Sequence, residues 1–257
     1  MDMNIAIVTG ASNGIGREFV YLLDEEGLDE IWVIARREER LQALQNEAST
    51  RLRILACDLT QWDAIHVIAE LLANEKPSVQ YLINSAGFGK IGSFADIPLD
   101  DLAAMIDLNC RAAVALTQIA IPFMPHGSHI LEICSSAAFQ PMPYFNVYAA
   151  TKAFLYRYSR ALRVELAPKG IVVTAVCPYW IRDTEFIQVA QKTKNSAYIH
   201  NFPWASTQKT VALRSLRGAK NGAAVVTPGL IPFLHRIITS VLPHGFMMYA
   251  SKIFHKI

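Results

Sequence analysis

Short apolar runs alternate with longer amphipathic stretches over the first two-thirds of the chain. The apolar runs are rich in β-branched residues and predict strands at 5–8, 31–35, 53–57, 81–84, 129–133 and 172–176. The amphipathic stretches predict helices at about 15–26, 37–48, 61–74, 101–123 and 147–166. Several strands are apolar at nearly every position, as expected when helices cover both faces of a parallel sheet. The pattern predicts an α/β fold with a doubly wound, mostly parallel sheet and helices on both faces.

The pattern changes after about residue 185. A helix is predicted near 207–220 and a short strand at 223–226, and beyond it apolar residues recur at helical spacing up to Val241. No Gly/Ser-rich linker divides the sequence. We therefore predict a single domain over 1–257, with a substrate-loop region at about 179–206 and an apolar, basic tail at about 230–257.

Composition narrows the class of protein. The 257 residues are 52% hydrophobic and 10% aromatic, which is enough for a sizeable core and excludes disorder as the main state. The first strand starts near Met1, which leaves no room for a secretory signal, and no Pro-free apolar window is long enough to predict a spanning helix. The four Cys show no paired spacing, so free thiols and a cytoplasmic location are expected. The seven His show no metal-ligand spacing, and no metal site is predicted.

Charge is distributed unevenly. Residues 1–185 carry 15 Lys/Arg against 22 Asp/Glu, whereas residues 186–257 carry nine Lys/Arg and no acidic residue. The basic segment indicates an anionic partner, such as a carboxylate substrate, an acyl-carrier or coenzyme A phosphate, or a lipid surface. Solvated Lys and Arg on helix faces are an equal alternative, and nothing predicts a nucleic-acid partner. The tail could lie on an anionic membrane as a peripheral contact, cover a partner subunit, or pack on its own domain, which is the default.

A glycine-rich turn joins the first predicted strand to the first helix, with the sequence Thr9-Gly10-Ala11-Ser12-Asn13-Gly14-Ile15-Gly16. Gly10 allows a sharp turn, Gly14 allows the backbone to approach a pyrophosphate, and Gly16 allows close packing of helix on strand. The free N–H groups of the helix N-terminus favour phosphate. The predicted cofactor-binding residues of this turn are Gly10, Ser12, Asn13, Gly14, Ile15 and Gly16.

Residues of a possible acid–base site follow the fifth predicted strand. Tyr148 and Lys152 are four residues apart at the start of a helix, so phenol and ammonium share one face. A free phenol has a pKa of roughly 10, and we expect the ammonium to lower it. Ser135 lies 13 residues before Tyr148, and its hydroxyl could bond a carbonyl oxygen as an oxyanion donor does.

These motifs together resemble the short-chain dehydrogenase/reductase superfamily, in the shorter branch with T-G-x-x-x-G-x-G and Y-x-x-x-K. The resemblance implies a Rossmann-type fold, Tyr148 as acid/base, Lys152 as its partner and a holder of the nicotinamide ribose, Ser135 as the carbonyl donor, and Asn109 as support for a proton relay. It also implies cofactor contacts beyond the glycine turn. They come from Asp58 and Leu59 after the third strand, Asn84, Ala86 and Gly87 after the fourth, and Pro178 and Thr184 after the sixth.

The end of the second predicted strand indicates which cofactor is bound. An NAD site usually has a carboxylate there, to bind the ribose hydroxyls, whereas this chain has Ala35-Arg36-Arg37. Two Arg side chains can hold a 2′-phosphate by charge-assisted bonds. The sequence therefore favours NADP(H) over NAD(H), the alternative being that Arg36 and Arg37 only begin a solvated helix.

The predicted function is NADP(H)-dependent interconversion of a ketone and a secondary alcohol. Apolar and aromatic residues at 179–206, with Phe88, Gln140, Met142 and Phe145, predict an apolar substrate such as a 3-oxoacyl chain or a hydroxysteroid, although they could equally be lid packing. The alternative is a catalytically silent NADP(H)-sensing regulator or a membrane-docked scaffold of the same fold. The resemblance further implies a homodimer or homotetramer that pairs through the helices near 101–123 and 147–166.

Overall fold

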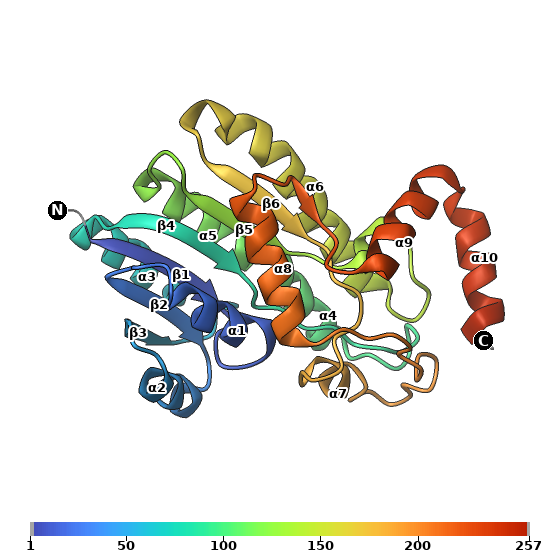
Figure 1. Ribbon diagram of the computed structural model, residues 1–257. Coiled ribbons are helices and arrows are strands. Elements are labelled where there is room, and N and C mark those ends of the chain that lie inside the picture. Colours follow the sequence, from blue (N-terminus) through green and yellow to red (C-terminus); the bar gives the residue numbers. More distant parts are fainter. Residues whose placement is uncertain (1–2, 256–257) are drawn as a thin grey trace.

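Seven parallel strands form one sheet in the computed structural model, which describes residues 3–255 (Figure 1). Their order is β3-β2-β1-β4-β5-β6-β7, and every neighbouring pair is parallel. The strands are β1 Asn4–Thr9, β2 Glu30–Ala35, β3 Arg51–Ala56, β4 Ser78–Asn84, β5 His129–Ile133, β6 Val172–Val176 and β7 Val225–Val226. The predicted doubly wound α/β fold is confirmed. The differences lie at strand ends, because pairing with a neighbour and not the apolar run alone decides where a strand stops.

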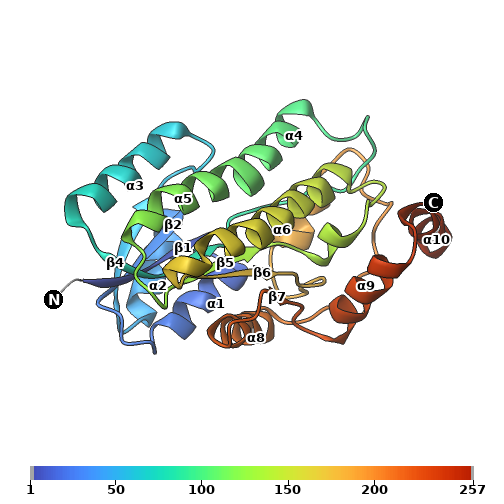
Figure 2. The ribbon, with the colours of Figure 1, turned by 90° about the horizontal axis from the view of Figure 1, so that it is seen from above.

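Helices cover both faces of the sheet (Figure 2). Alternate residues of β1 point to opposite faces: Ile5 and Ile7 pack with one set of helices, and Ala6 and Val8 with the other. The first set is α3 Trp62–Glu75, α5 Ala113–Ala120 and α6 Asn146–Leu166. The second set is α1 Gly14–Leu23, α2 Glu38–Glu47 and α8 Gln208–Lys220. Burial on both faces explains why the strands are apolar throughout.

The helix predicted at 101–123 is interrupted. It consists of α4 Leu99–Ile106, a π-helical segment Asp107–Ala112, α5, and a 3₁₀ turn Ile121–Phe123. A π-helical insertion changes the direction of the side chains it carries and is frequent at functional sites. In the described part of the chain, the combined stretch Leu99–Phe123 is long and apolar enough to cross a membrane, but half of it is buried, as in a core helix.

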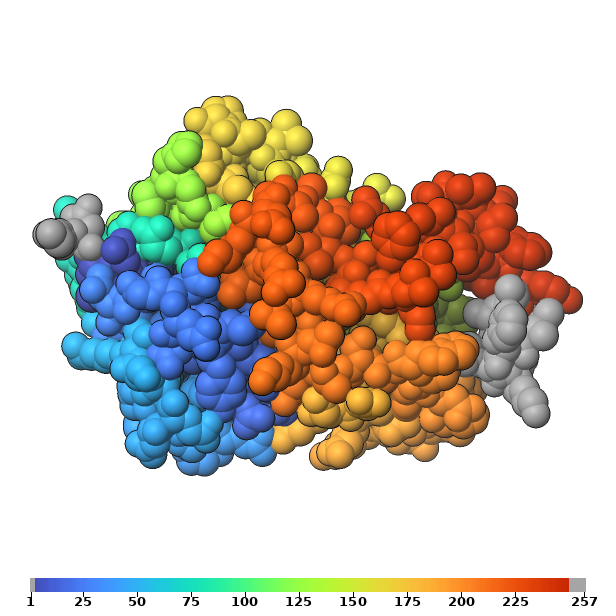
Figure 3. Space-filling model, viewed as in Figure 1, coloured from blue at the N-terminus to red at the C-terminus, as the bar shows by residue number. Residues whose placement is uncertain are grey.

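The C-terminal region leaves the sheet. After α8 and β7 the chain forms α9 Leu230–Val241 and α10 His244–His255, which lie at the end of the molecule opposite the N-terminus (Figures 1 and 3). Residues 256–257 of the predicted tail lie outside the described residues. α9 packs beside a 3₁₀ turn, Ser136–Phe139, where His235 contacts Gln140 at 3.1 Å and the Phe139 ring. One side of α9 therefore packs on its own domain.

Candidate active site

The candidate site lies at the carboxyl ends of the strands. The strand order changes direction between β1 and β4, which is where open α/β sheets bind ligands. A cavity of about 370 Å³ occupies this edge and is continuous from Arg36 and Arg37 at one end to Tyr148 and Lys152 at the other. It brings together most of the residues that the sequence predicted. Those lining it are Gly10, Ser12, Asn13, Gly14, Ile15, Arg36, Arg37, Asp58, Leu59, Ala86, Gly87, Ser135, Tyr148, Lys152, Pro178 and Thr184.

The glycine turn has the conformation that its sequence predicts. Gly10 and Gly14 have φ of 68° and 61°, which side chains disfavour. A Cβ on Gly10 would lie 2.9 Å from the Ala86 backbone nitrogen, so the turn fits closely against the chain after β4. Gly16 does not line the cavity, and a Cβ there would collide with the Gly10 carbonyl, which is the helix–strand packing expected of it. Asn13 caps α1 by accepting a bond from the Gly14 N–H at 2.7 Å.

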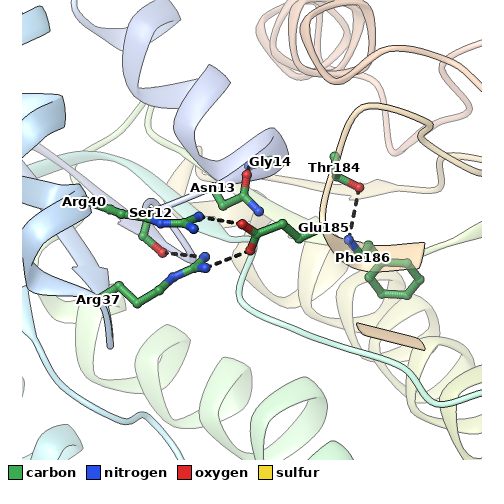
Figure 4. A network of polar contacts seen from close by, with 8 residues as sticks. All are labelled: Ser12, Asn13, Gly14, Arg37, Arg40, Thr184, Glu185 and Phe186. Carbon is green, nitrogen blue, oxygen red and sulfur yellow. Dashed lines mark hydrogen bonds and ion pairs between the residues drawn. The ribbon is translucent and has the colours of Figure 1, made fainter. Parts of the chain in front are cut away.

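Arginines gather at the end of the cavity next to β2 (Figure 4). Arg36 is largely exposed and lies 4.0 Å from Asp58. Arg37 donates to Glu185 at 2.7 Å and reaches Ser12 at 3.4 Å. Arg40 donates to the other oxygen of Glu185, also at 2.7 Å. The sequence reasoning missed Arg40 and Glu185, because the residues are 145 positions apart and no local pattern connects them.

Tyr148 is buried, with 6% of its surface exposed. It lies in the first turn of α6, where its ring packs on those of Phe145 and Phe186. Its side chain and that of Ser135 line the same cavity. Burial raises the pKa of Tyr148 well above its ordinary value, and the Ser135 hydroxyl lowers it only in part. The phenol is therefore protonated at neutral pH.

Lys152 is also buried and donates to the Ile133 carbonyl at 2.7 Å. Its ammonium lies 5.8 Å from the centre of the Tyr148 ring. The expectation that the pKa of Tyr148 lies below its ordinary value is not met in this structure, because burial is the largest cause and the net shift is upward. Burial also lowers the pKa of Lys152 itself.

Asn109 lies in the π-helical segment and is buried behind the cavity wall. Its amide donates to the Phe88 carbonyl at 2.9 Å and to Thr151 at 3.1 Å, and its oxygen accepts from the Phe88 N–H at 3.1 Å. A Cβ on Gly87 would lie 2.9 Å from the Asn109 oxygen and 3.3 Å from the Lys152 nitrogen. Gly87 therefore lets Asn109 and Lys152 approach the same point of the backbone.

Asn84 is placed differently from its predicted role. It does not line the cavity and is buried, where its amide donates to Thr117 and Glu132 at 2.9 Å each. These bonds connect β4, α5 and β5 beneath the cavity. The position of Asn84 therefore does not support the predicted direct contact with a cofactor. Glu132 is fully buried, and burial raises its pKa to about 7. No local signal in the sequence points to this carboxyl, since a lone Glu in a strand is usually exposed.

Aromatic side chains line the end of the cavity beyond Tyr148. Phe145 stacks on Trp180 with ring centres 5.6 Å apart, and Trp180 packs edge-on against Phe202. Phe88 and Met142 line the cavity too, as predicted, whereas Gln140 instead contacts His235. His235, on α9, lines the cavity as well, a contact that the sequence reasoning missed. This end is therefore apolar and suits an apolar ligand.

The cysteines and metal-ligating groups add no further chemistry. All four Cys are free thiols, and Cys134 and Cys177 are buried. In the part of the chain that the structure describes, no group of three or more His, Cys, Asp or Glu is placed to hold a metal ion.

Comparison with known proteins agrees with this geometry. The family model for short chain dehydrogenases matches residues 4–195. An uncharacterized oxidoreductase of Staphylococcus aureus strain MW2 is 31% identical over 177 residues, which are 68% of this chain and 76% of that protein. A short-chain dehydrogenase from Sphingobium yanoikuyae in complex with NADPH has a TM-score of 0.77 at 26% identity, covering 93% of this chain and 96% of that one. A bulky-bulky ketone specific alcohol dehydrogenase from Comamonas testosteroni has a TM-score of 0.73 at 25% identity, covering 95% and 96%. The chain therefore belongs to the short-chain dehydrogenase family and is an oxidoreductase of that type.

Proposed function

We propose that the protein is an NADP(H)-dependent oxidoreductase that interconverts a ketone and a secondary alcohol on an apolar substrate. The observation that carries the proposal is the cavity that joins the glycine turn to the side chains of Ser135, Tyr148 and Lys152. The solved relatives named above include one bound to NADPH and one specific for ketones. Both the cofactor and the reaction class are therefore consistent with structural neighbours.

The cavity suits an extended dinucleotide phosphate. The glycine turn presents the N-terminus of α1 to a pyrophosphate. Arg36 and Arg37 line the end of the cavity next to β2, where they would bind a 2′-phosphate. Lys152, at the opposite end, is positioned for a ribose hydroxyl. We therefore assign the preference for NADP(H) to the two arginines.

A bound NADPH would supply hydride to the substrate carbonyl carbon. Tyr148, protonated because it is buried, donates a proton to the carbonyl oxygen. The Ser135 oxygen accepts the Ala137 N–H at 3.1 Å, which leaves its O–H available to donate to the substrate oxygen. Lys152, fixed by the Ile133 carbonyl, places positive charge beside the phenolate that Tyr148 becomes. Asn109 holds the backbone at Phe88, next to which a water relay could return the proton.

The proposal is tested by following NADPH oxidation with steroid ketones, 3-oxoacyl thioesters and quinones. Tyr148→Phe should abolish turnover and leave the Kd for NADPH unchanged, because it removes only the transferable proton. Tyr156→Phe is the matched control, since Tyr156 lies on the same helix and does not line the cavity. Unchanged turnover in Tyr148→Phe refutes the mechanism.

Cofactor binding separates the two candidate functions. Arg36→Ala with Arg37→Ala should weaken NADPH much more than NADH, and equal losses contradict the assigned preference. Tight NADPH binding without reduction of any carbonyl would instead favour the silent, cofactor-sensing regulator.

A further inference from the structure

The loop after β6 is tied by Glu185 to Arg37, which precedes α2, and to Arg40 on α2 (Figure 4). Glu185 accepts from Arg37 through one oxygen and from Arg40 through the other, at 2.7 Å each. We call this three-residue arrangement the Glu185 bridge. Its side chains are between a third and a half exposed. Arg37 and Glu185 both line the cavity, so the bridge lies at a solvent-accessible part of the cavity wall.

The same loop also touches the glycine turn. The Thr184 side chain lies 3.4 Å from where a Cβ on Gly14 would be. On its other side the loop is held by Asp183, which accepts the Gln208 N–H at the start of α8 at 2.8 Å. Three consecutive residues, 183–185, thus contact α8, the glycine turn and the two arginines of the bridge. Breaking or forming the Glu185 bridge is therefore linked to the position of the loop.

We propose that Glu185 is an internal competitor for the phosphate that Arg37 binds. On binding of a 2′-phosphorylated nucleotide, Arg37 transfers from the Glu185 carboxylate to the phosphate, and Glu185 remains on Arg40. Glu185 is then a specificity-determining residue. It weakens the binding of nucleotides that carry a 2′-phosphate and leaves the binding of those without one nearly unaffected. The proposal rests on the proposed function in one respect, namely that Arg37 is the phosphate ligand.

Charge and position support this assignment. A carboxylate and a dianionic phosphate on one guanidinium would repel each other. Arg40 lines a small neighbouring cavity and not the main one, so it can keep Glu185 without occupying the phosphate position. The pKa of Glu185 is lowered to about 2, mainly by its bonds to Arg37 and Arg40. The competing charge therefore persists at every working pH.

The test compares 2′,5′-ADP with 5′-AMP by calorimetric titration of the full chain. Glu185→Gln should tighten 2′,5′-ADP by about five- to tenfold, as for loss of one or two partly exposed ion pairs, and change 5′-AMP by less than about twofold. Asp183→Asn is the matched control: it removes one charge from the same loop and keeps the oxygen that caps α8. Unchanged or weaker 2′,5′-ADP binding in Glu185→Gln overturns the proposal.

A double-mutant cycle tests the role of Arg40. Arg40→Gln should weaken 2′,5′-ADP when Glu185 is present, because Glu185 then depends on Arg37 alone, and should have little effect in the Glu185→Gln background. Equal weakening in both backgrounds means that Arg40 binds the phosphate itself and overturns the transfer. Arg37→Ala distinguishes failure of the proposed cofactor site from failure of the proposed competition. If Arg37→Ala leaves the affinity for 2′,5′-ADP unchanged, the proposed cofactor site is wrong. If Arg37→Ala weakens binding and Glu185→Gln has no effect, only the competition is wrong.

A second, independent observation concerns α9, which exposes its most apolar face to solvent and packs a more polar face on the protein. The side that packs on the protein carries Pro232, His235 and Thr239. The opposite side exposes a continuous apolar row, which we call the α9 stripe: Leu230, Phe233, Leu234, Ile237, Ile238 and Val241. Leu230 and Val241 are 70% and 75% exposed. A helix that turns its apolar face to water predicts a partner for that face.

We propose that the α9 stripe docks on an anionic lipid surface. α9 carries Arg236 and no acidic residue, and the chain from residue 186 onward has nine Lys/Arg and no Asp or Glu. No carboxylate of this segment therefore repels such a surface. Phe246 and Tyr249 of α10 add exposed aromatic rings beyond the stripe. Because His235 of the same helix lines the cavity, docking would place the apolar end of the cavity near the lipid.

Co-sedimentation of the full chain with vesicles tests this docking. Binding is expected to mixed phosphatidylglycerol–phosphatidylcholine vesicles, to fall with added salt, and to be weak to phosphatidylcholine alone. Phe233→Ser with Ile237→Ser should reduce binding about tenfold or more. Val164→Ser, at an apolar residue of α6 that is more exposed than either, should not. If the wild type does not bind these vesicles, or if the double variant changes the oligomeric state in light scattering and leaves vesicle binding unchanged, the stripe is not a lipid contact.

Discussion

Glu132→Gln tests how burial of one carboxyl controls stability. The side chain is fully buried, and accepts from Asn84 at 2.9 Å and Thr117 at 3.0 Å through one oxygen, while the other oxygen has no partner. Burial is the largest cause that raises its pKa from 4.5 to about 7, with the two hydrogen bonds and Lys152 lowering it in part. The pKa of Glu132 is higher in the folded than in the unfolded state. The contribution of this carboxyl to the free energy of unfolding is therefore fully present below about pH 4.5, and it is lost as the pH rises through about 7. At 1.36 kcal/mol per pKa unit, the loss is about 3 kcal/mol.

The assay is urea unfolding at about pH 5 and about pH 8. Gln keeps an oxygen that accepts from Asn84 and Thr117 but carries no ionisable group. The decrease in the free energy of unfolding between the two pH values should therefore be smaller in Glu132→Gln than in the wild type by about 2–3 kcal/mol. Glu165→Gln, an exposed position on α6, is the control and should preserve the wild-type pH dependence. An identical pH dependence in Glu132→Gln and the wild type would refute the reasoning.

The site carries three further predictions. Since burial raises the pKa of Tyr148, initial rates of ketone reduction should stay constant up to about pH 9, and a fall centred near neutrality would contradict a protonated phenol. Ser135→Ala removes both the bond that lowers that pKa and a donor to the substrate oxygen, so kcat should fall by about 10²–10³-fold in steady-state assays. Gly87→Ala places a Cβ 2.9 Å from the Asn109 oxygen and should cost about 1–3 kcal/mol in urea unfolding, whereas Gly245→Ala, which meets open space, should be neutral.

The sequence by itself determined the succession of strands and helices along the chain and most of the residues that line the cavity. Apolar runs buried on both faces of a sheet and helical periodicity are local properties, and a residue after each parallel strand must reach the same edge. Local pattern, together with the resemblance to short-chain dehydrogenases, therefore predicts that Gly10, Gly14, Ser135, Tyr148 and Lys152 lie in one place, and they line the same cavity.

Tertiary structure alone decided the electrostatics of the site and the use of its surfaces. Glu185 meets Arg37 and Arg40 only because the loop after β6 folds back over α2. Lys152 bonds the Ile133 carbonyl, and Tyr148 is buried among side chains that include the sequence-distant Phe186. The pKa of the phenol therefore moves opposite to the direction that spacing predicted. Desolvation, ion pairing and helix orientation depend on which segments meet in space, and those contacts are not encoded in any local pattern.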